Sequence, residues 1–288
     1  MSEISTVIWD GDNTLWDWME YAVPAYEAMC AEIARISGKS EDETAEAMKV
    51  FYTSKGTIED AGLIQGLQSS GFFNEVGGFD IGKTVQRVQR IFSNVRSKNL
   101  NVYEGITDSV RQIHNRGIRQ ILLTDAPLVQ ANGRMKHTKL RGYFSDIHAM
   151  PAAVIPNLHN RFRETESSVI TNPANHVLTG EKPHTDLAAI LSMTRDEIAA
   201  TVAIVGDNDS KDMELARQFN CVGIHAEYGA AQAELVQRLQ KFAPPRVARR
   251  NMQIGDSPQN SGTEKRTGAT KIMQAKSPHE IMGLLFDR

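Results

Sequence analysis

The sequence predicts an α/β protein with a Rossmann-like, doubly wound parallel sheet as its core and an inserted all-helical cap domain. Short, continuously apolar runs rich in β-branched residues alternate with helical patterns along most of the chain, as expected for buried parallel strands joined by helices. The segment 17–101 shows helical periodicity and no convincing strand. With 288 residues and a hydrophobic fraction of 41%, the chain can form a full core and about two structural units.

Six apolar runs are expected to form strands. Each reads as a continuous run and not as an alternation, because a parallel strand is covered on both faces. The series is interrupted once, between the first and second runs, by the helical segment 17–101. The expected strands are Thr6–Trp9, Gln120–Leu123, Asp146–Ala149, His176–Leu178, Val202–Val205 and Cys221–His225.

Helices are predicted from apolar residues at helical spacing and from N-terminal caps. Ile106, Val110 and Ile113 share one face of a helix that ends at Gly117. Two further stripes run from Leu187 to Leu191 and from Leu215 to Phe219. Capping boxes predict helix starts at Ser40 with Glu43, at Thr194 with Glu197, and at Ser277 with Glu280, where Pro278 would be the first helical residue.

These patterns divide the chain into two domains. The predicted α/β core comprises 1–16 and 102–288, and the predicted helical cap comprises 17–101. Within the core, the segment 151–180 is rich in Pro, Asn, His and Ser and is expected to form an elaborated loop that ends in a short strand. The Gly- and Ser-rich segment 244–270 is expected to be a mobile loop.

Composition excludes several classes of function. The net charge of −3 and the pI near 6.3 give no basic excess for binding nucleic acid. Two cysteines, Cys30 and Cys221, form neither a disulfide framework nor a zinc-binding spacing. No signal peptide and no apolar run of membrane-spanning length is visible, so we expect a cytoplasmic protein without membrane partners.

Polar residues follow the first two predicted strands at one edge of the sheet. Asp10 and Asp12 come directly after the first strand, and Thr124 and Asp125 follow the second. The carboxyl ends of parallel strands are where open α/β sheets bind ligands. Two carboxylates this close repel each other unless a cation or a proton offsets their charge. An ordinary turn with Asp10 as a helix cap is the structural alternative.

Two later segments complete the series. Lys182 precedes Pro183, which suits the first turn of a helix. A helix beginning there would fix the lysine at its N-terminal end. Asp207 follows the strand that begins at residue 202, and Asp209 and Asp212 come shortly after it. Capping of the next helix would explain one of these acidic residues but does not require three.

The ordered series Asp-x-Asp-x-Thr, Thr-Asp, Lys-Pro and Gly-Asp with a further Asp resembles the four motifs of the haloacid dehalogenase superfamily. The likeness spans Asp10 to Asp212 and extends to Tyr103–Gly105 and Arg141–Phe144. This resemblance implies a hydrolase core with a helical cap between the first two motifs. It also implies Asp10 as the nucleophile that forms an aspartyl-phosphate and Asp12 as general acid and base.

The same resemblance implies phosphate-binding and metal-binding residues. Thr124, Asp125 and Lys182 are expected at the phosphoryl oxygens, although Asp125 stands where Asn or Ser is more usual. Mg²⁺ is the expected cofactor, and it prefers oxygen ligands. The expected metal ligands are Asp10, the backbone carbonyl of Asp12, Asp207 and Asp212, with Asp209 as the competing second acid of the last motif.

The expected activity is hydrolysis of a small phosphorylated metabolite by a Mg²⁺-dependent phosphatase. Asp12 favours this activity, because a dehalogenase releases halide and needs no proton donor there. A phosphomutase, a dehalogenase or a non-catalytic binding relative on the same scaffold remain alternatives, and a phosphonate hydrolase would need a cap lysine such as Lys55. Trp16, Trp18 and Tyr21 are expected either to line the substrate pocket or to pack as a hydrophobic hinge.

Overall fold

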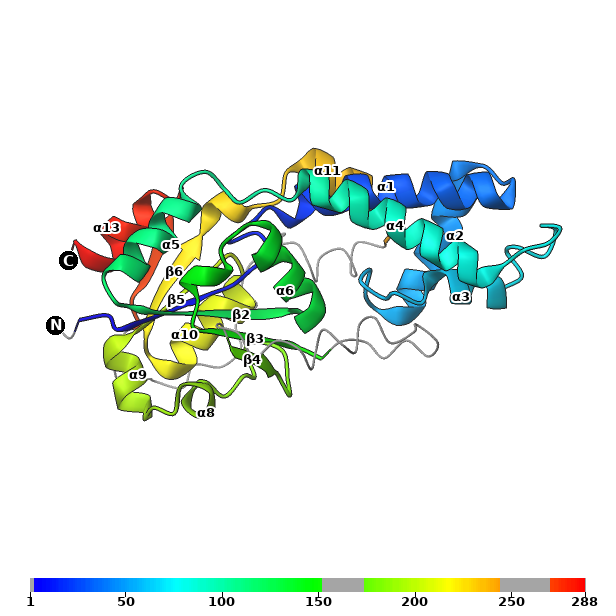
Figure 1. Cartoon of the computed structure of the whole chain (residues 1–288). Coiled ribbons are helices and arrows are strands. Elements are labelled where there is room, and N and C mark those ends of the chain that lie inside the picture. Colours follow the sequence, from blue (N-terminus) through cyan, green and yellow to red (C-terminus); the bar gives the residue numbers. More distant parts are fainter. Residues whose placement is uncertain (1–2, 152–173, 244–269, 288) are drawn as a thin grey trace. The chain divides into compact units, whose positions relative to one another are not determined.

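The computed structural model describes residues 3–151, 174–243 and 270–287 (Figure 1). The predicted mobile loop at 244–270 therefore lies, except for Thr270, outside the described residues, as does most of the predicted loop at 151–180. Among the described helices, none combines the length and the hydropathy that a membrane crossing requires.

The contacts of the chain separate two compact units. The α/β unit comprises Met1–Asp17, Asn101–Ala230 and Gly255–Arg288. The helical unit comprises Trp18–Leu100 and Ala231–Ile254. Apart from shifts of one residue at two boundaries, this division differs from the predicted one at the segment Ala231–Ile254, which groups with the helices of the insertion and not with the core.

Within the described residues, the α/β unit is built on one seven-stranded sheet in which every neighbouring pair of strands is parallel. The strands are β1 (Thr6–Trp9), β2 (Arg119–Pro127), β3 (Asp146–Met150), β4 (Ala174–Val177), β5 (Val202–Gly206), β6 (Val222–Ala226) and β7 (Ile272–Ala275). Their spatial order is β4-β3-β2-β1-β5-β6-β7. The predicted fold class, a doubly wound parallel sheet, is confirmed.

The chain builds the sheet in two directions from its centre. It winds outward from β1 to β4 and then continues from β5 to β7 on the other side of β1. The topological switch therefore lies between β1 and β5, which pair in register from Thr6 with Val202 to Trp9 with Val205. Ligands of open α/β sheets bind outside the carboxyl ends of the strands at such a point.

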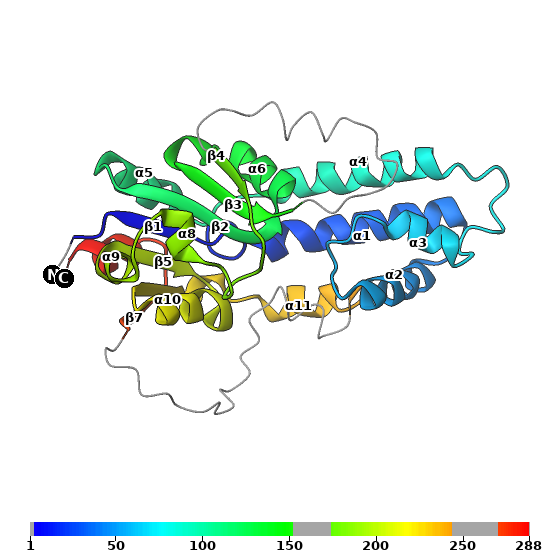
Figure 2. The same ribbon diagram turned by 90° about the horizontal axis from the view of Figure 1, so that it is seen from below.

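Helices cover both faces of this sheet (Figure 2). One face carries α5 (Ile106–Asn115), α6 (Leu128–His137) and α13 (Glu280–Phe286). The other carries α8 (Leu187–Leu191), α9 (Arg195–Thr201) and α10 (Glu214–Phe219). On this second face, Ile8, Ile121 and Ile204 of three adjacent strands pack with Leu187, Leu191, Ile198, Leu215 and Phe219 in one buried cluster.

The helix caps follow the predictions in two places and depart from them in one. Ser40 with Glu43 and Thr194 with Glu197 form complete capping boxes. The box predicted at Ser277 is wrong, because α13 begins only at Glu280 and has no side-chain cap. The carboxylate of Glu280 instead accepts a hydrogen bond from the Lys276 amide at 2.9 Å, across a tight turn that delays the helix.

The helical unit has two components that are distant in sequence. The insertion forms α1 (Trp18–Ser37), α2 (Glu41–Lys55), α3 (Leu63–Ser69) and α4 (Ile81–Asn99), and the later segment adds α11 (Ala233–Leu239). Helix α1 packs against α2, α4 and α11. Glu27 of α1 accepts two hydrogen bonds from Arg238 of α11, and Tyr26 contacts the rings of Phe92 and Phe242.

Candidate active site

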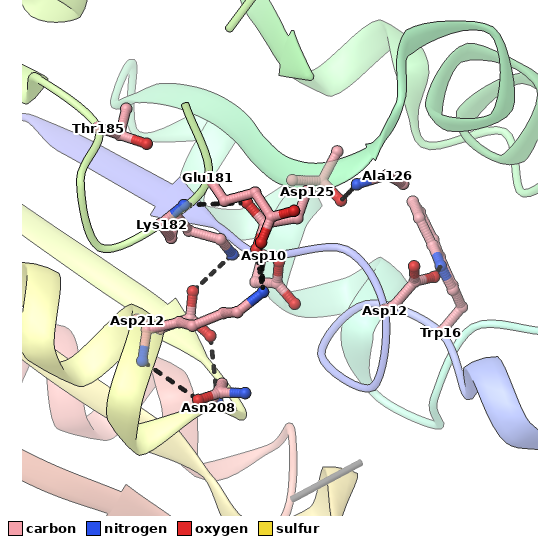
Figure 3. Close-up of polar contacts among 12 residues, drawn as sticks. Asp10, Asp12, Trp16, Asp125, Ala126, Glu181, Lys182, Thr185, Asn208 and Asp212 are labelled. Carbon is pink, nitrogen blue, oxygen red and sulfur yellow. Dashed lines mark hydrogen bonds and ion pairs between the residues drawn. The ribbon is translucent and has the colours of Figure 1, made fainter. Parts of the chain in front are cut away.

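The carboxyl ends of β1, β2 and β5 bring the predicted motif residues together with the turn after β4 (Figure 3). Asp10 follows β1 directly, and its amide donates a hydrogen bond to the Val205 carbonyl of β5 at 2.9 Å. This bond continues the pairing of the two strands by one residue. The Asp10 side chain is thereby fixed at the switch point, where it is 10% exposed.

Lys182 joins two carboxylates in the centre of this site. Its Nζ atom lies 2.5 Å from Asp10 Oδ1 and 2.6 Å from Asp212 Oδ1. The second oxygen of Asp212 accepts a hydrogen bond from the Asn208 amide at 3.1 Å. All three charged side chains are buried, and Asp212 is completely so.

A third carboxylate, that of Asp207, belongs to the same group. Carboxylate oxygens of Asp10, Asp207 and Asp212 all lie within 4.8 Å of one another. Asp207 is 7% exposed and accepts a hydrogen bond from the Asn13 side chain. Its backbone carbonyl lies 2.8 Å from His225 Nε2. The chain thus holds three buried carboxylates against one ammonium group, and we call these four residues the Asp10 centre.

Burial and mutual repulsion govern the protonation of this centre. Burial raises the pKa of Asp10 to about 7, with Asp212 adding to the rise and Lys182 opposing it. Burial, together with Asp10 and Asp212, raises the pKa of Asp207 well above its ordinary value. Burial alone would lower the pKa of Lys182, but Asp10 and Asp212 outweigh it and raise that pKa well above the ordinary value. The centre therefore keeps a charged lysine and favours a further cation or protons.

Two glycines allow the backbone to approach this centre. A Cβ atom on Gly206 would lie 2.3 Å from the Asp212 carboxyl carbon, so only glycine lets Asp212 pack against the end of β5. A Cβ atom on Gly229 would lie 1.8 Å from the Asn13 carbonyl oxygen. Both separations are too short for any other residue without movement of the neighbouring atoms.

The two acidic residues that compete as second acid of the last motif lie in different environments. Asp212 is in the Asp10 centre, whereas the Asp209 side chain is 63% exposed and binds Arg217 at 2.6 Å. Both are in a π-helical turn, Asp209–Met213, and the Asn208 side chain caps this turn by accepting a hydrogen bond from the Lys211 amide. The geometry of this turn directs the Asp212 side chain toward Lys182 and the Asp209 side chain toward Arg217.

The second motif and the lysine lie side by side. Thr124 is 2% exposed, and its Oγ1 atom accepts a hydrogen bond from the Ala126 amide at 3.2 Å. The Asp125 carboxylate accepts one hydrogen bond from the Lys182 amide at 3.1 Å and one from Lys211 Nζ at 2.6 Å. Burial alone would raise the pKa of Asp125. The positive charges of Lys182 and Lys211 outweigh that effect and hold the pKa below its ordinary value. Asp125 thus positions the backbone of the lysine.

The expected helical position of Lys182 is wrong. Residues 181–185 form a turn, with the His184 amide bonded to the Glu181 carbonyl at 3.0 Å, and α8 begins only at Leu187. The side chain of Asp186, not Pro183, marks the start of that helix, because it accepts hydrogen bonds from the amides of Ala188 and Ala189.

Asp12 lies apart from the buried carboxylates, beside two donors. Both of its oxygens accept hydrogen bonds from Arg134 Nη1, at 2.6 and 2.8 Å, and Oδ1 also accepts one from Trp16 Nε1 at 2.6 Å. Arg134 comes from α6 and its side chain is only 3% exposed. Its Nη2 atom donates to Gln130 one turn earlier in the same helix. The position of Asp12 is therefore defined by a buried guanidinium.

The three aromatic residues proposed for a substrate pocket are all buried. Trp16 contacts Asp12 in the α/β unit. In the helical unit, Trp18 donates to Glu59 at 3.4 Å, and its ring meets that of Tyr21 edge to face at 6.4 Å. These contacts are those of packed side chains within each unit, and both expectations for the three residues stay predictions.

Several residues of the site have no sequence signal of their own. Arg134 is one of many basic residues on helices, and Lys211 reads as a surface lysine beside a helix start. Tyr228 donates a hydrogen bond to the Thr14 carbonyl, 214 positions away, at 2.9 Å. Asn13, Gly206 and Lys211 lie inside the motifs, whereas Arg134 and Tyr228 lie outside them.

Comparisons with known proteins agree with this geometry. The family model of the haloacid dehalogenase-like hydrolases matches residues 4–220. A HAD phosphatase from Thermococcus onnurineus has a similar structure, with a TM-score of 0.53, 14% identity and coverage of 98% of each chain. A putative beta-phosphoglucomutase from Thermotoga maritima matches with a TM-score of 0.52, 16% identity and coverage of 99% of each chain.

A 2-haloacid dehalogenase from Pseudomonas syringae pv. Tomato DC3000 matches with a TM-score of 0.52, 16% identity and coverage of 98% of each chain. No curated protein matches the sequence. At such identities the structural likeness concerns the fold, which proteins named for three different activities share. The activity must therefore be argued from the residues of the site.

Proposed function

The chain belongs to the haloacid dehalogenase-like hydrolases, and from this premise we propose that it is a Mg²⁺-dependent phosphatase acting on a small phosphate ester. The observation that carries the proposal is the Asp10 centre. A buried carboxylate at the switch point of the sheet has two further carboxylates within 4.8 Å and a lysine at 2.5 Å. Asp12, two residues after Asp10 in the chain, supports a phosphatase over a dehalogenase, since ester cleavage must protonate a leaving oxygen.

In the proposed reaction, an oxygen of Asp10 attacks the phosphorus atom and the bond to the ester oxygen breaks. The alcohol leaves and an aspartyl-phosphate forms on Asp10, which divides one difficult displacement into two easier steps. Water then attacks the phosphorus atom, the bond to Asp10 breaks, and inorganic phosphate is released. Lys182 and the Thr124 hydroxyl are the proposed contacts of the phosphoryl oxygens, where charge must be stabilised.

Asp12 would protonate the leaving oxygen in the first step and take a proton from water in the second. Arg134 and Trp16 hold its carboxylate in one orientation. Because the guanidinium binds both oxygens, it suits the charged form of Asp12 that the second step requires. Asp12 would have to turn one oxygen away from Arg134 to carry a proton to the ester.

The residues of the Asp10 centre fit a magnesium ion. Their oxygen donors are those that Mg²⁺ prefers, and they carry an excess of negative charge that one lysine does not balance. Asp10, Asp207 and Asp212 would hold the ion, together with the backbone carbonyl of Asp12. When bound, Mg²⁺ would offset the repulsion between the anionic nucleophile and an anionic phosphate.

A small phosphorylated metabolite is the proposed substrate class, because helical insertions of this kind close over small molecules and exclude water. We propose neither a nucleic acid nor a membrane as partner, in line with the acidic net charge. Cytoplasmic location belongs to the same proposal, since small phosphate esters are abundant there.

The test is phosphate release from a panel of small phosphate esters, with Mg²⁺ or with EDTA, for the wild type, Asp10→Asn and Asp209→Asn. Asp209 is the matched control, because it is an aspartate of the same segment that lies outside the centre. We expect Mg²⁺-dependent release by the wild type and Asp209→Asn. For Asp10→Asn we expect a loss of about 10⁴-fold or more, as for removal of other nucleophiles.

Activity of Asp10→Asn equal to that of the wild type would refute the proposed nucleophile. Halide release from 2-haloacids by a protein that hydrolyses no ester would instead assign the dehalogenase alternative. Phosphate transfer between two sugar positions without net release would assign the phosphomutase alternative. A well-folded, Mg²⁺-loaded protein with none of these activities would favour a binding relative.

A further inference from the structure

A second group of potential ligands lies in the sheet, away from the Asp10 centre. Asp146 and His148 are two residues apart on β3 and therefore point to the same face. His176 lies on the neighbouring strand β4, directly in register with His148. Figure 1 shows β3 and β4 side by side, with β4 as the outermost strand of the sheet on this side.

The three side chains converge. The imidazole rings of His148 and His176 are stacked, with centroids 4.4 Å apart and planes 9° from parallel. The Nε2 atom of His176 lies 3.4 Å from Asp146 Oδ1. One ring nitrogen of each histidine and one carboxylate oxygen all lie within 4.8 Å of one another. Rotation of the two rings out of their stacked arrangement would let these three atoms reach a common ion, because the lone pair of an imidazole nitrogen lies in the plane of its ring.

His148 supplies an independent sign that a ligand is missing. It is 5% exposed, and its Nε2 atom has no hydrogen-bond partner among the described residues. An unpaired polar atom in such a place is costly and calls for an explanation. Burial, with the neighbouring His176 adding to it, lowers the pKa of His148 to about 4. A neutral ring nitrogen without a hydrogen-bond partner is the group with which histidine binds metals.

Asp146 is held in place for the same role. Its Oδ2 atom accepts hydrogen bonds from Arg119 at 2.8 Å and from Ser145 Oγ at 2.7 Å. These contacts leave Oδ1 directed at His176. Contacts of this kind around a ligating carboxylate orient it toward the ion, as outer partners do in metal sites. Arg119 is the nearby cation that a metal must tolerate, and its charge is already paired with Oδ2.

We propose that Asp146, His148 and His176 bind a late first-row divalent metal ion, with Zn²⁺ as the expected one. Two imidazole nitrogens and one carboxylate oxygen are ligands that this class of ion prefers, and three protein ligands leave a fourth position for water. The Asp10 centre has only oxygen ligands and suits a harder ion. The ligand types of the two groups therefore differ: only the group on β3 and β4 offers imidazole nitrogens.

Such an ion would tie the outermost strand to the body of the sheet. Strand β4 is short, with only four residues, and is joined to the sheet through its pairing with β3. The chain then runs from His176 to Lys182 of the Asp10 centre within six residues. A metal at β3 and β4 would thus fix the base of the turn that carries the lysine, and would stabilise the folded state by binding to it alone.

The test is a titration of the full-length, Mg²⁺-saturated protein with Zn²⁺ in competition with a chromophoric chelator. The variants are His176→Ala, Asp146→Asn and His137→Ala, where His137 is an exposed histidine on α6 and serves as the matched control. His176 is preferred to His148 because its side chain is 47% exposed, so its removal should not prevent folding.

Because Zn²⁺ can also displace Mg²⁺ from the Asp10 centre, the decisive quantity is the difference between proteins. The wild type and His137→Ala should bind one Zn²⁺ per chain more than His176→Ala. At that site the affinity of His176→Ala should fall by more than about 100-fold, beyond the loss caused by changes to outer partners. Asp146→Asn should weaken it in the same direction.

Replacing Zn²⁺ by Co²⁺ gives a second readout that does not depend on activity. The wild type should show the intense visible absorption of four-coordinate Co²⁺ with imidazole ligands, and His176→Ala should lose it. Identical Zn²⁺ stoichiometry and identical Co²⁺ spectra for the wild type and His176→Ala would overturn the proposal. Those results would identify the two rings as a stacked pair without a metal. Neither outcome depends on which ester, if any, the Asp10 centre hydrolyses.

Discussion

The two sides of the loop after β1 hold their carboxylates in opposite surroundings, although only Gly11 separates Asp10 from Asp12. Asp10 is 10% exposed and shares one lysine with two other buried carboxylates. Asp12 is 25% exposed and has a buried guanidinium of its own at 2.6 Å. The surroundings of Asp10 are short of positive charge, whereas the charge of Asp12 is balanced by its arginine.

This difference indicates how one short motif supplies two chemical roles. A carboxylate in an anion-rich, buried group favours a further cation, whereas a carboxylate paired with arginine is already neutralised. The partners that distinguish them come from distant segments, namely α6 for Asp12 and the turn after β4 for Asp10. The roles of the two residues are thus assigned by the fold and not by the loop itself.

The largest expected effect comes from removing the cation on the Asp10 side. Lys182→Met should lower the free energy of unfolding by about 3–5 kcal/mol, because it leaves buried carboxylates without their partner. The measurement is urea unfolding with and without Mg²⁺. The loss should shrink when Mg²⁺ is added, since the ion binds the folded state and replaces the missing charge.

Lys211→Met is the matched control for that prediction. Lys211 pairs with Asp125 at 2.6 Å, but its side chain is 22% exposed. Its removal should therefore cost less, and Mg²⁺ should not restore the loss. Equal losses for the two variants, both insensitive to Mg²⁺, would show that the Asp10 centre is not short of positive charge.

The next largest effect is expected from removing the guanidinium that binds Asp12. Arg134→Met should lower kcat for ester hydrolysis about 100-fold, as expected when a catalytic group loses its alignment. The dependence of kcat on Mg²⁺ concentration should stay that of the wild type, because Arg134 binds the side chain of Asp12, whereas the proposed contact of Asp12 with the ion is its backbone carbonyl. Steady-state kinetics over a range of Mg²⁺ concentrations provides both values.

A double-mutant cycle separates positioning of Asp12 from a general loss of structure. If Arg134 acts through Asp12, Asp12→Asn with Arg134→Met should be no slower than Asp12→Asn alone. Arg141→Met is the control, since Arg141 donates its hydrogen bond to the Asn132 side chain at 2.9 Å. Multiplicative losses in the double mutant would exclude this role for Arg134.

The smallest expected effect concerns the backbone approach that seats Asp212. Gly206→Ala should displace the Asp212 carboxyl, which would lie 2.3 Å from the new methyl group, and should weaken Mg²⁺ binding about 10-fold or more. Gly142→Ala is the control, because its Cβ would meet nothing within 4 Å. Calorimetric titration with Mg²⁺ measures the affinity of both variants. Unchanged Mg²⁺ binding by Gly206→Ala would show that Asp212 is not a metal ligand.

The sheet could be predicted from sequence because its central strands are buried on both faces. All residues of β1 and β5 are buried, and both appear as continuous apolar runs. Strand β7 was missed, because only one of its four residues is buried and Gln274 interrupts its apolar run. Helix α11 reads as an ordinary amphipathic helix, and nothing local indicates that it packs with α1.

The site was predictable only where its residues follow strands. The motif order identified Asp10, Lys182 and Asp207, and the structure brings all three together. The choice of Asp212 over Asp209 depends on the phase of one π-helical turn, which spacing does not reveal. Arg134 could not be found, because its partner Asp12 is 122 positions away and either residue alone is unremarkable in composition.

The division of the helical unit between two chain segments bears on the order in which the protein can fold during synthesis. Helices α1 to α4 leave the ribosome first, but Arg238, the partner of Glu27, follows 211 positions later. Phe242, which contacts Tyr26, is made later still. Most of the α/β sheet is therefore synthesised before the helical unit can complete its packing, so the insertion, although translated early, is finished late.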